Sequence, residues 1–143
     1  MEQPMSEARG AEMRTIPSEA QIHALVHGFY DKVRSDAELG PIFNAVISDW
    51  DPHLEKMCAF WSSVMRMSGR YHGNPMAAHL RLKTAQPAHF DRWLGLFSAT
   101  ARELFTTDLA DAFVGRAENI ARSLQLGMFW SGAGRSARAE DPA

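Results

Sequence analysis

Apolar residues recur every three to four positions along most of the chain, and this spacing is the feature that most limits its fold. No segment alternates apolar and polar residues over a useful length, so no sheet is expected. The pattern predicts an all-α domain. The residues on the expected buried faces are Ile22, Leu25, Val26, Phe29 and Val33, then Met57, Phe60, Trp61 and Val64, then Phe90, Trp93, Phe97, Ala101 and Leu104, and finally Leu109, Phe113, Ala117, Ile120, Leu124 and Met128.

Capping residues and prolines predict where the helices begin and end. Gly40-Pro41 is expected to interrupt the pattern before a short apolar piece at 42–47. Ser68-Gly69 is expected to end the helix that carries His53. The expected start signals are Ser18 with Glu19 in the first turn, Asp51-Pro52, Asn74-Pro75, Pro87 and Thr107-Asp108.

The chain of 143 residues fits one compact domain. We expect that domain to span 17–130, between a flexible N-terminal extension (1–16) and a disordered C-terminal tail (131–143), because both ends are polar and aperiodic. The first fifteen residues lack the apolar segment of a secretory signal, and no run approaches the roughly 18 apolar residues of a membrane span. A cytoplasmic protein is predicted, with no membrane partner.

Composition excludes several functional classes. The net charge of −2 gives no electrostatic basis for nucleic-acid binding. One cysteine, Cys58, rules out a disulfide framework and a cysteine-based zinc or iron–sulfur site. No Glu-x-x-His pair, phosphate-binding glycine loop or Gly-x-Ser-x-Gly turn occurs. The six histidines among eight Phe, four Trp and two Tyr are therefore the residues that need an explanation.

Each candidate residue has a structural and a functional interpretation. His53 falls near the middle of an apolar face, so it is either a hydrogen-bonded core histidine or part of a pocket wall. His79, in an apolar context, is either a surface histidine or a ligand presented into a cavity. Trp93 and Tyr30 either pack or donate into a pocket. The pair His23 and His27 has metal-ligand spacing but lies off the apolar face, so both side chains are expected in solvent.

The order of these residues resembles the truncated (two-over-two) haemoglobins of group III, over about 16–130. The resemblance implies a globin-like fold, in which a shortened two-over-two helical sandwich surrounds haem. The matching residues are Phe29-Tyr30-Asp31-Lys32-Val33-Arg34, Leu39-Gly40-Pro41-Ile42-Phe43, His53, Phe60-Trp61, Tyr71, Gly73, Pro75, His79-Leu80, Phe90, Trp93-Leu94, Leu96-Phe97, Arg116-Ala117 and Ile120-Ala121.

The resemblance also implies residue roles around a haem b. His79 corresponds to the ligand of the haem iron, with its other ring nitrogen held by an acceptor. Tyr30, His53 and Trp93 match positions on the distal side, where the iron takes its small ligand. The remaining expected contacts are Phe29, Met57, Phe60 and Trp61 as pocket wall, and Arg70, His72 and Arg81 as candidates for the haem propionates from their charge and position.

The function implied by the resemblance is binding of O₂, NO, CO or peroxide at an iron that can be pentacoordinate. Hydrogen bonds from Tyr30 and Trp93 would retain the ligand, and His53 would gate its access. Tight retention favours redox chemistry, such as removal of NO or peroxide, over oxygen delivery. The alternatives are a haem-dependent peroxidase or NO dioxygenase proper, served by an unidentified reductase, and a haem-free helical interaction module.

Overall fold

The computed structural model describes residues 16–75 and 86–130, and no strand occurs in them. The prediction of an all-α domain is confirmed. No helix of these two ranges is long and apolar enough to cross a bilayer. Most of the helix predicted after Asn74-Pro75 falls outside the described residues. The elements are α2 (Glu19–Ser35), α3 (Leu39–Val46), α4 (Trp50–Arg66), α6 (Pro87–Leu104), α7 (Thr107–Gln125) and a π-helical turn, η1 (Leu126–Trp130).

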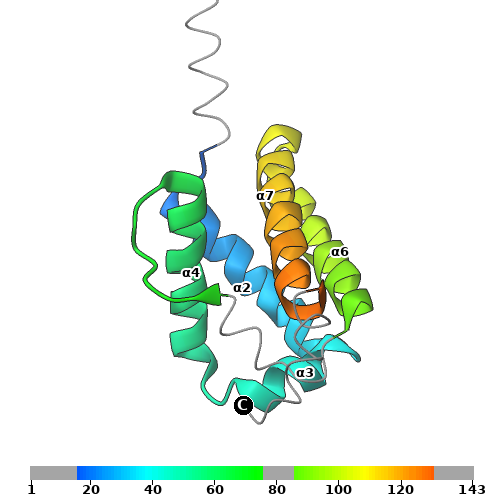
Figure 1. Ribbon diagram of the computed structural model, residues 1–143. Coiled ribbons are helices and arrows are strands. Elements are labelled where there is room, and N and C mark those ends of the chain that lie inside the picture. Colours follow the sequence, from blue (N-terminus) through cyan, green and yellow to red (C-terminus); the bar gives the residue numbers. More distant parts are fainter. Residues whose placement is uncertain (1–15, 76–85, 131–143) are drawn as a thin grey trace, which may run out of the picture.

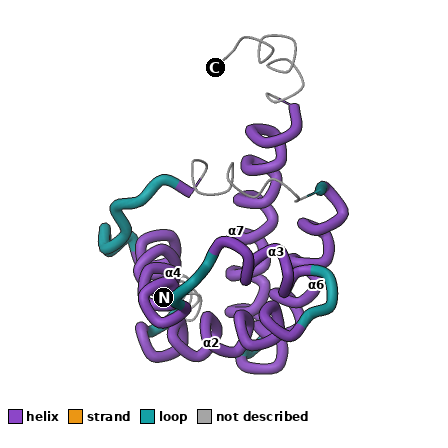
Figure 2. The backbone as a smooth tube through the Cα atoms, turned by 90° about the horizontal axis from the view of Figure 1, so that it is seen from below, coloured by secondary structure: helices purple, strands orange, loops and turns teal. Residues whose placement is uncertain are grey.

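The long helices form two antiparallel pairs, α2 with α4 and α6 with α7 (Figure 1). In the first pair the end of α4 meets the start of α2, where Ser62 donates to Glu19, and the start of α4 meets Tyr30 near the end of α2. Helix α2 also packs on α6, which joins the two pairs. Seen from below, α4 and α6 lie on opposite sides of the described fold (Figure 2).

Aromatic side chains fill the space where the four long helices meet. Phe97 of α6 is 1% exposed, and its ring stacks on Trp61 of α4 (centroids 5.0 Å apart) and on Trp93 (5.5 Å). We call these three rings the aromatic column. Phe29 of α2 contacts Phe97 edge-on at 5.2 Å, and Phe113 of α7 lies 6.4 Å from it. The buried Phe97 ring of α6 therefore meets an aromatic ring from each of the other three long helices.

Helix α2 begins as the sequence predicts. The Ser18 side chain accepts a hydrogen bond from the Gln21 backbone N–H at 3.1 Å, and the Gln21 side chain accepts one from the Ser18 N–H at 2.9 Å. This reciprocal arrangement satisfies two backbone donors that the helix itself cannot pair. Glu19 places a carboxylate in the first turn, where the helix dipole stabilises it.

The prediction that Gly40-Pro41 interrupts the helical pattern is wrong, because both residues lie in the first turn of α3. Proline is tolerated there, since the first backbone N–H groups of a helix have no partner within it. The turn is held by Asp36, whose Oδ2 accepts from the N–H groups of Glu38 (3.0 Å) and Leu39 (2.9 Å). A Cβ at Gly40 would lie 2.7 Å from the carbonyl oxygen of Arg34, so glycine permits this close approach.

The boundaries predicted for α4 are also wrong by one or two residues. The helix starts at Trp50 rather than at Asp51-Pro52, and Asp49 precedes it without a side-chain cap. The ring of Trp50 packs on α2, so tertiary contact extends the helix before the proline. At the other end, Met67 adopts the left-handed conformation (φ 56°) and closes the helix, ahead of the predicted stop at Ser68-Gly69.

The starts of α6 and α7 confirm the prediction. Pro87 is the first residue of α6, and Thr106 caps α7, its hydroxyl accepting from the Leu109 N–H at 3.4 Å. The π-helical turn after Gln125 was not predicted from the sequence. It carries Phe129, whose ring meets Phe90 near the start of α6 at 6.1 Å. This contact ties the end of α7 back to α6.

Candidate functional site

Tyr30 and His53, two of the three predicted distal residues, lie in contact. Tyr30 is on α2 and 5% exposed, and His53 is half-buried on the first turn of α4. Their ring centroids are 5.4 Å apart and their planes are nearly perpendicular, at 88°. The antiparallel packing of α2 and α4 produces this meeting, because it places the start of one helix beside the end of the other.

The Tyr30 hydroxyl is a donor with no acceptor among the described residues. Burial raises the pKa of Tyr30, and no charged or hydrogen-bonding side chain contributes to the shift. The phenol therefore keeps its proton well above the pH at which an ordinary tyrosine ionises. A buried tyrosine hydroxyl normally has a hydrogen-bond partner. Among the described residues this hydroxyl has none, which fits a donor to a polar ligand.

Trp93, the third predicted distal residue, approaches from α6. It is half-buried, and within the described ranges nothing accepts a hydrogen bond from its indole N–H. Its ring meets Phe29 edge-on at 5.3 Å, and Phe29 in turn meets Tyr30 at 4.8 Å. Phe29, predicted as pocket wall, thus links the two donors. The structure brings all three predicted distal residues and Phe29 into one contact chain.

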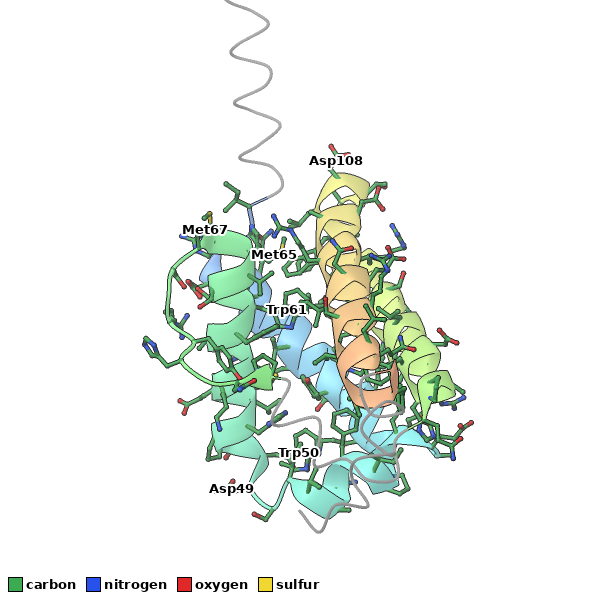
Figure 3. All side chains as sticks on the ribbon, viewed as in Figure 1. Asp49, Trp50, Trp61, Met65, Met67 and Asp108 are labelled. Atoms are coloured by element: carbon green, nitrogen blue, oxygen red, sulfur yellow. The ribbon has the colours of Figure 1, made fainter. Side chains whose placement is uncertain are left out.

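The other predicted wall residues lie on α4 beyond His53. Met57 and Phe60 are half-buried and pack against the core. Trp61 is 3% exposed and belongs to the aromatic column, and Figure 3 shows it between α4 and α7. The Phe60 ring stands edge-on to Tyr71 at 5.2 Å. The three wall side chains follow His53 by one to two turns of α4 and pack in the core cluster that contains Tyr30.

Of the three residues predicted to contact the haem propionates, Arg70 is paired at the start of α2, His72 is exposed, and Arg81 lies outside the described residues. The Arg70 guanidinium pairs with Glu19 at 2.5 Å, and Arg66 approaches the same carboxylate at 3.3 Å. Glu19 precedes Tyr30 by eleven residues, about 16 Å along the helix at 1.5 Å per residue. His72 is exposed. His79, the predicted iron ligand, and Arg81 lie outside the described residues.

The pair His23 and His27 stacks ring on ring, with centroids 3.9 Å apart. His23 is exposed, as the sequence predicts, while His27 is half-buried. A stable metal site needs further protein ligands, and no group of three metal-ligating side chains exists in 16–75 and 86–130. The pair alone does not make a metal centre.

Trp50 is a member of this site that the sequence reasoning missed. Its ring centroid lies 5.4 Å from that of His53 and 5.9 Å from that of Tyr30. Figure 3 shows it at the end of α4 that adjoins α3. Its spacing from His53, three residues, is the signal that could have revealed it, because residues three apart share a helix face. The misplaced helix start hid that relationship.

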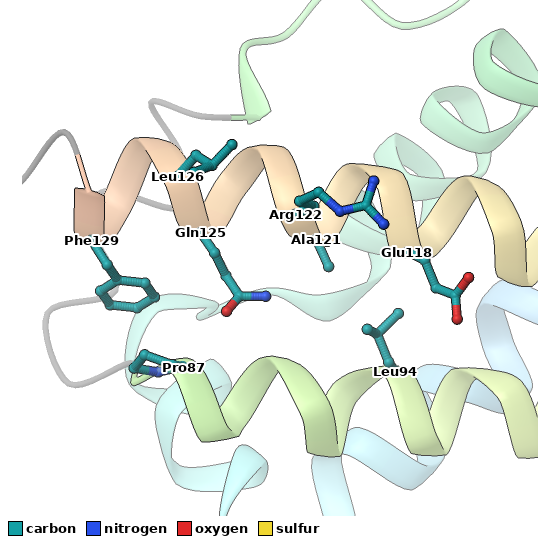
Figure 4. Close-up of a pocket in the computed structure, with 8 residues that line it drawn as sticks. All are labelled: Pro87, Leu94, Glu118, Ala121, Arg122, Gln125, Leu126 and Phe129. Atoms are coloured by element: carbon teal, nitrogen blue, oxygen red, sulfur yellow. The ribbon is translucent and has the colours of Figure 1, made fainter.

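A separate cleft of about 520 Å³ opens between α6, α7 and η1 (Figure 4). Pro87 and Leu94 line one side, and Ala121, Leu126 and Phe129 line the other, with Glu118, Arg122 and Gln125 alongside. None of the predicted site residues belongs to its lining. The cleft is therefore distinct from the group around Tyr30.

Comparison with known proteins gives one consistent answer. The family model described as bacterial-like globin matches residues 14–125. A curated relative, the group 3 truncated hemoglobin ctb of Campylobacter jejuni, is 34% identical over 118 residues, which cover 80% of this chain and 92% of that protein. A crystal structure of the group III truncated hemoglobin from Campylobacter jejuni matches with a TM-score of 0.76 and 32% identity, over 79% of this chain and 92% of that one.

Proposed function

Because this chain belongs to the bacterial-like globin family, as a group III truncated haemoglobin, we propose that it binds haem b and retains O₂ or a related small ligand beside Tyr30, His53 and Trp93. The observation that carries the proposal is the buried Tyr30 hydroxyl, which has no acceptor among the described residues. Bound haem supplies an iron whose open coordination position takes a diatomic molecule. His79 is the proposed iron ligand.

The donor groups of the site fit a ligand that carries partial negative charge. The Tyr30 O–H and the Trp93 N–H come from different helices, and both lack acceptors in the described part of the chain. A hydrogen bond to a charged group contributes about 1.5–3 kcal/mol. Each donor would therefore slow ligand release by roughly one to two decades.

The side chains around the donors would shape and dry the pocket. Phe29 lies between Tyr30 and Trp93 and contacts both rings. Met57, Phe60 and Trp61 would extend the apolar wall along α4. His53, in contact with Tyr30, is the proposed gate. Arg70 would reach a haem propionate only by leaving Glu19, so His72 and Arg81 are the simpler candidates.

Slow release favours chemistry on the retained ligand, such as removal of NO or peroxide, over oxygen delivery. Sustained turnover of that kind needs a reductase, which we propose as a protein partner of this chain. Stopped-flow mixing with NO and with peroxide tests this part of the proposal. Fast reactions of both would support a redox role, and slow reactions of both would favour a role in binding alone.

Haem binding itself is tested by adding haemin to the purified chain and recording the visible spectrum. A strong Soret band is expected, and it should be lost in His79→Ala but kept in His23→Ala, which removes an exposed histidine. A pyridine haemochrome spectrum identifies the haem type. A folded chain that stays colourless with haemin would refute the proposal.

The distal assignment is tested by oxygen dissociation rates. Tyr30→Phe and Trp93→Leu should each speed dissociation by about ten- to a hundredfold, because each removes one donor. Tyr71→Phe serves as a matched control, since that hydroxyl belongs to a half-buried ring packed on Phe60. Unchanged rates in both distal variants would show that these residues do not hold the ligand.

A further inference from the structure

Trp50 is fixed by contacts from three helices. Its indole Nε1–H donates to the Asn44 Oδ1 of α3 at 3.0 Å. The guanidinium carbon of Arg34, from α2, lies 4.7 Å from the ring centroid, in cation–π contact. The ring also contacts Tyr30 of α2 and, within its own helix, His53. Four described neighbours thus determine where this half-buried indole lies.

The contact with His53 is the informative one. The planes of the two rings are nearly perpendicular, at 89°, and their centroids are 5.4 Å apart. His53 makes an equivalent perpendicular contact with Tyr30, also at 5.4 Å and at 88°. The imidazole therefore touches two aromatic rings, one from its own helix and one from α2. A swing of His53 away from Tyr30 also disturbs its contact with Trp50.

We propose that Trp50 is a positioning residue that holds the His53 ring against Tyr30, and thereby sets how readily a ligand enters the distal side. This inference rests on the proposed function. Asn44 and Arg34 affect His53 indirectly, because they contact Trp50 and fix the position of the indole that His53 meets. An aromatic pair of this geometry changes a two-state population by about two- to twelvefold. Removing the Trp50 ring should therefore enlarge the open population of His53 by that factor.

The experiment measures CO association by flash photolysis on the haem-loaded full chain. Trp50→Leu should raise the association rate about two- to twelvefold, whereas Trp50→Phe, which keeps a ring, should stay within about twofold of the native rate. Asn44→Ala removes only the acceptor of the indole N–H and should raise the rate by a smaller factor. Phe105→Leu is the control for lost packing, since this half-buried ring at the C-terminal end of α6 stacks on Phe113 and, among the described residues, makes no ring contact with Trp50 or His53.

A double-mutant cycle separates positioning from a general loss of structure. In a His53→Ala background, Trp50→Leu should change the rate by less than about twofold, because the residue that it positions is gone. An equal acceleration with and without His53 would overturn the inference. A native association rate in both Trp50→Leu and Asn44→Ala would also overturn it. If Trp50→Leu does not fold, the same comparison is made with Asn44→Ala, introduced into the native chain and into the His53→Ala variant.

The failure of the proposed function would be recognised separately, as a folded chain that takes up no haem. In that case the inference is decided on the full chain by nuclear Overhauser contacts between the His53 and Tyr30 rings. These contacts should persist in Trp50→Phe and weaken or vanish in Trp50→Leu. Contacts of native strength in Trp50→Leu would overturn the inference.

Discussion

The carboxylate of Asp36 joins the start of α3 to α6, and its charge should have a measurable effect on stability. Its Oδ2 accepts from the Arg92 Nε–H at 2.6 Å and from the backbone N–H groups of Glu38 and Leu39. The side chain is 9% exposed. The hydrogen bond from Arg92 is the largest cause that lowers the pKa of Asp36, from 3.8 to about 2. Asp36→Asn removes the charge and keeps a side chain of nearly the same shape.

The expected loss follows from the pKa difference between the folded and unfolded chain. The pKa of Asp36 falls from 3.8 to about 2 on folding, and at 1.36 kcal/mol per pKa unit this difference corresponds to roughly 2 kcal/mol at neutral pH. Arg92 is 41% exposed, so solvent screening reduces the value. We expect Asp36→Asn to lower the free energy of unfolding by about 1–2 kcal/mol at pH 7.

The pH dependence gives the prediction its sign. Because the folded pKa lies below the unfolded one, the stabilisation is fully present above pH 3.8 and is lost as the pH falls through about 2. The stability difference between the native chain and Asp36→Asn should therefore be constant from pH 7 to about 5. It should then shrink as the pH falls from about 4 towards 2.

Urea denaturation followed by circular dichroism at pH 7, 5, 4 and 3 measures this difference. Urea is preferred to guanidinium chloride because a salt would screen the ion pair. Asp31→Asn, an exposed acid on α2 five residues before Asp36, is the control and should show little difference at any pH. A difference for Asp36→Asn that does not change with pH, or that grows in acid, would refute the electrostatic reasoning.

Further predictions concern packing and alkaline stability. Gly40→Ala should lower the free energy of unfolding by about 1–3 kcal/mol, since the new Cβ would lie 2.7 Å from the Arg34 carbonyl oxygen. Gly28→Ala, where the nearest atom lies at 3.4 Å, should cost less in the same urea titration. Phe97→Ala should lower the unfolding free energy by about 3–5 kcal/mol, because it removes the ring on which four helices converge. The raised pKa of Tyr30 means that the unfolded chain loses its phenol proton first, so stability should fall as the pH rises above 10. Between pH 9 and 11 the melting temperature of Tyr30→Phe should fall less steeply than that of the native chain. Equal falls in the two proteins would contradict the raised pKa of Tyr30.

The parts of the fold that could be predicted are those governed by local chemistry. Ser18, Pro87 and the Thr107 start were identified because caps and prolines act within a few residues of themselves. The error at Gly40-Pro41 has a non-local cause, since Asp36 and the distant Arg92 hold the turn that admits both residues. The π-helical turn likewise depends on a contact between Phe129 and Phe90.

The candidate site also has a part that could be predicted and a part that could not. Apolar periodicity alone placed His53 on an inward face, and the resemblance added Tyr30 and Trp93, which the structure joins to it through ring contacts. Trp50 was missed because the prediction took Asp51 as the cap and began α4 at Pro52, two residues after Trp50, which removed it from the face that it shares with His53. An error of two residues at a helix boundary was enough to conceal a site residue.

The aromatic column also gives the chain a spectroscopic signature. Trp61 and Trp93 each stack on Phe97, with interplanar angles of 22° and 12°, inside a core where Phe97 is 1% exposed. Two indoles held in fixed, asymmetric surroundings should produce intense near-ultraviolet circular dichroism, which a compact state with loosened packing loses while its helices persist. The near-ultraviolet and far-ultraviolet bands of one sample therefore report separately on core packing and on helix content.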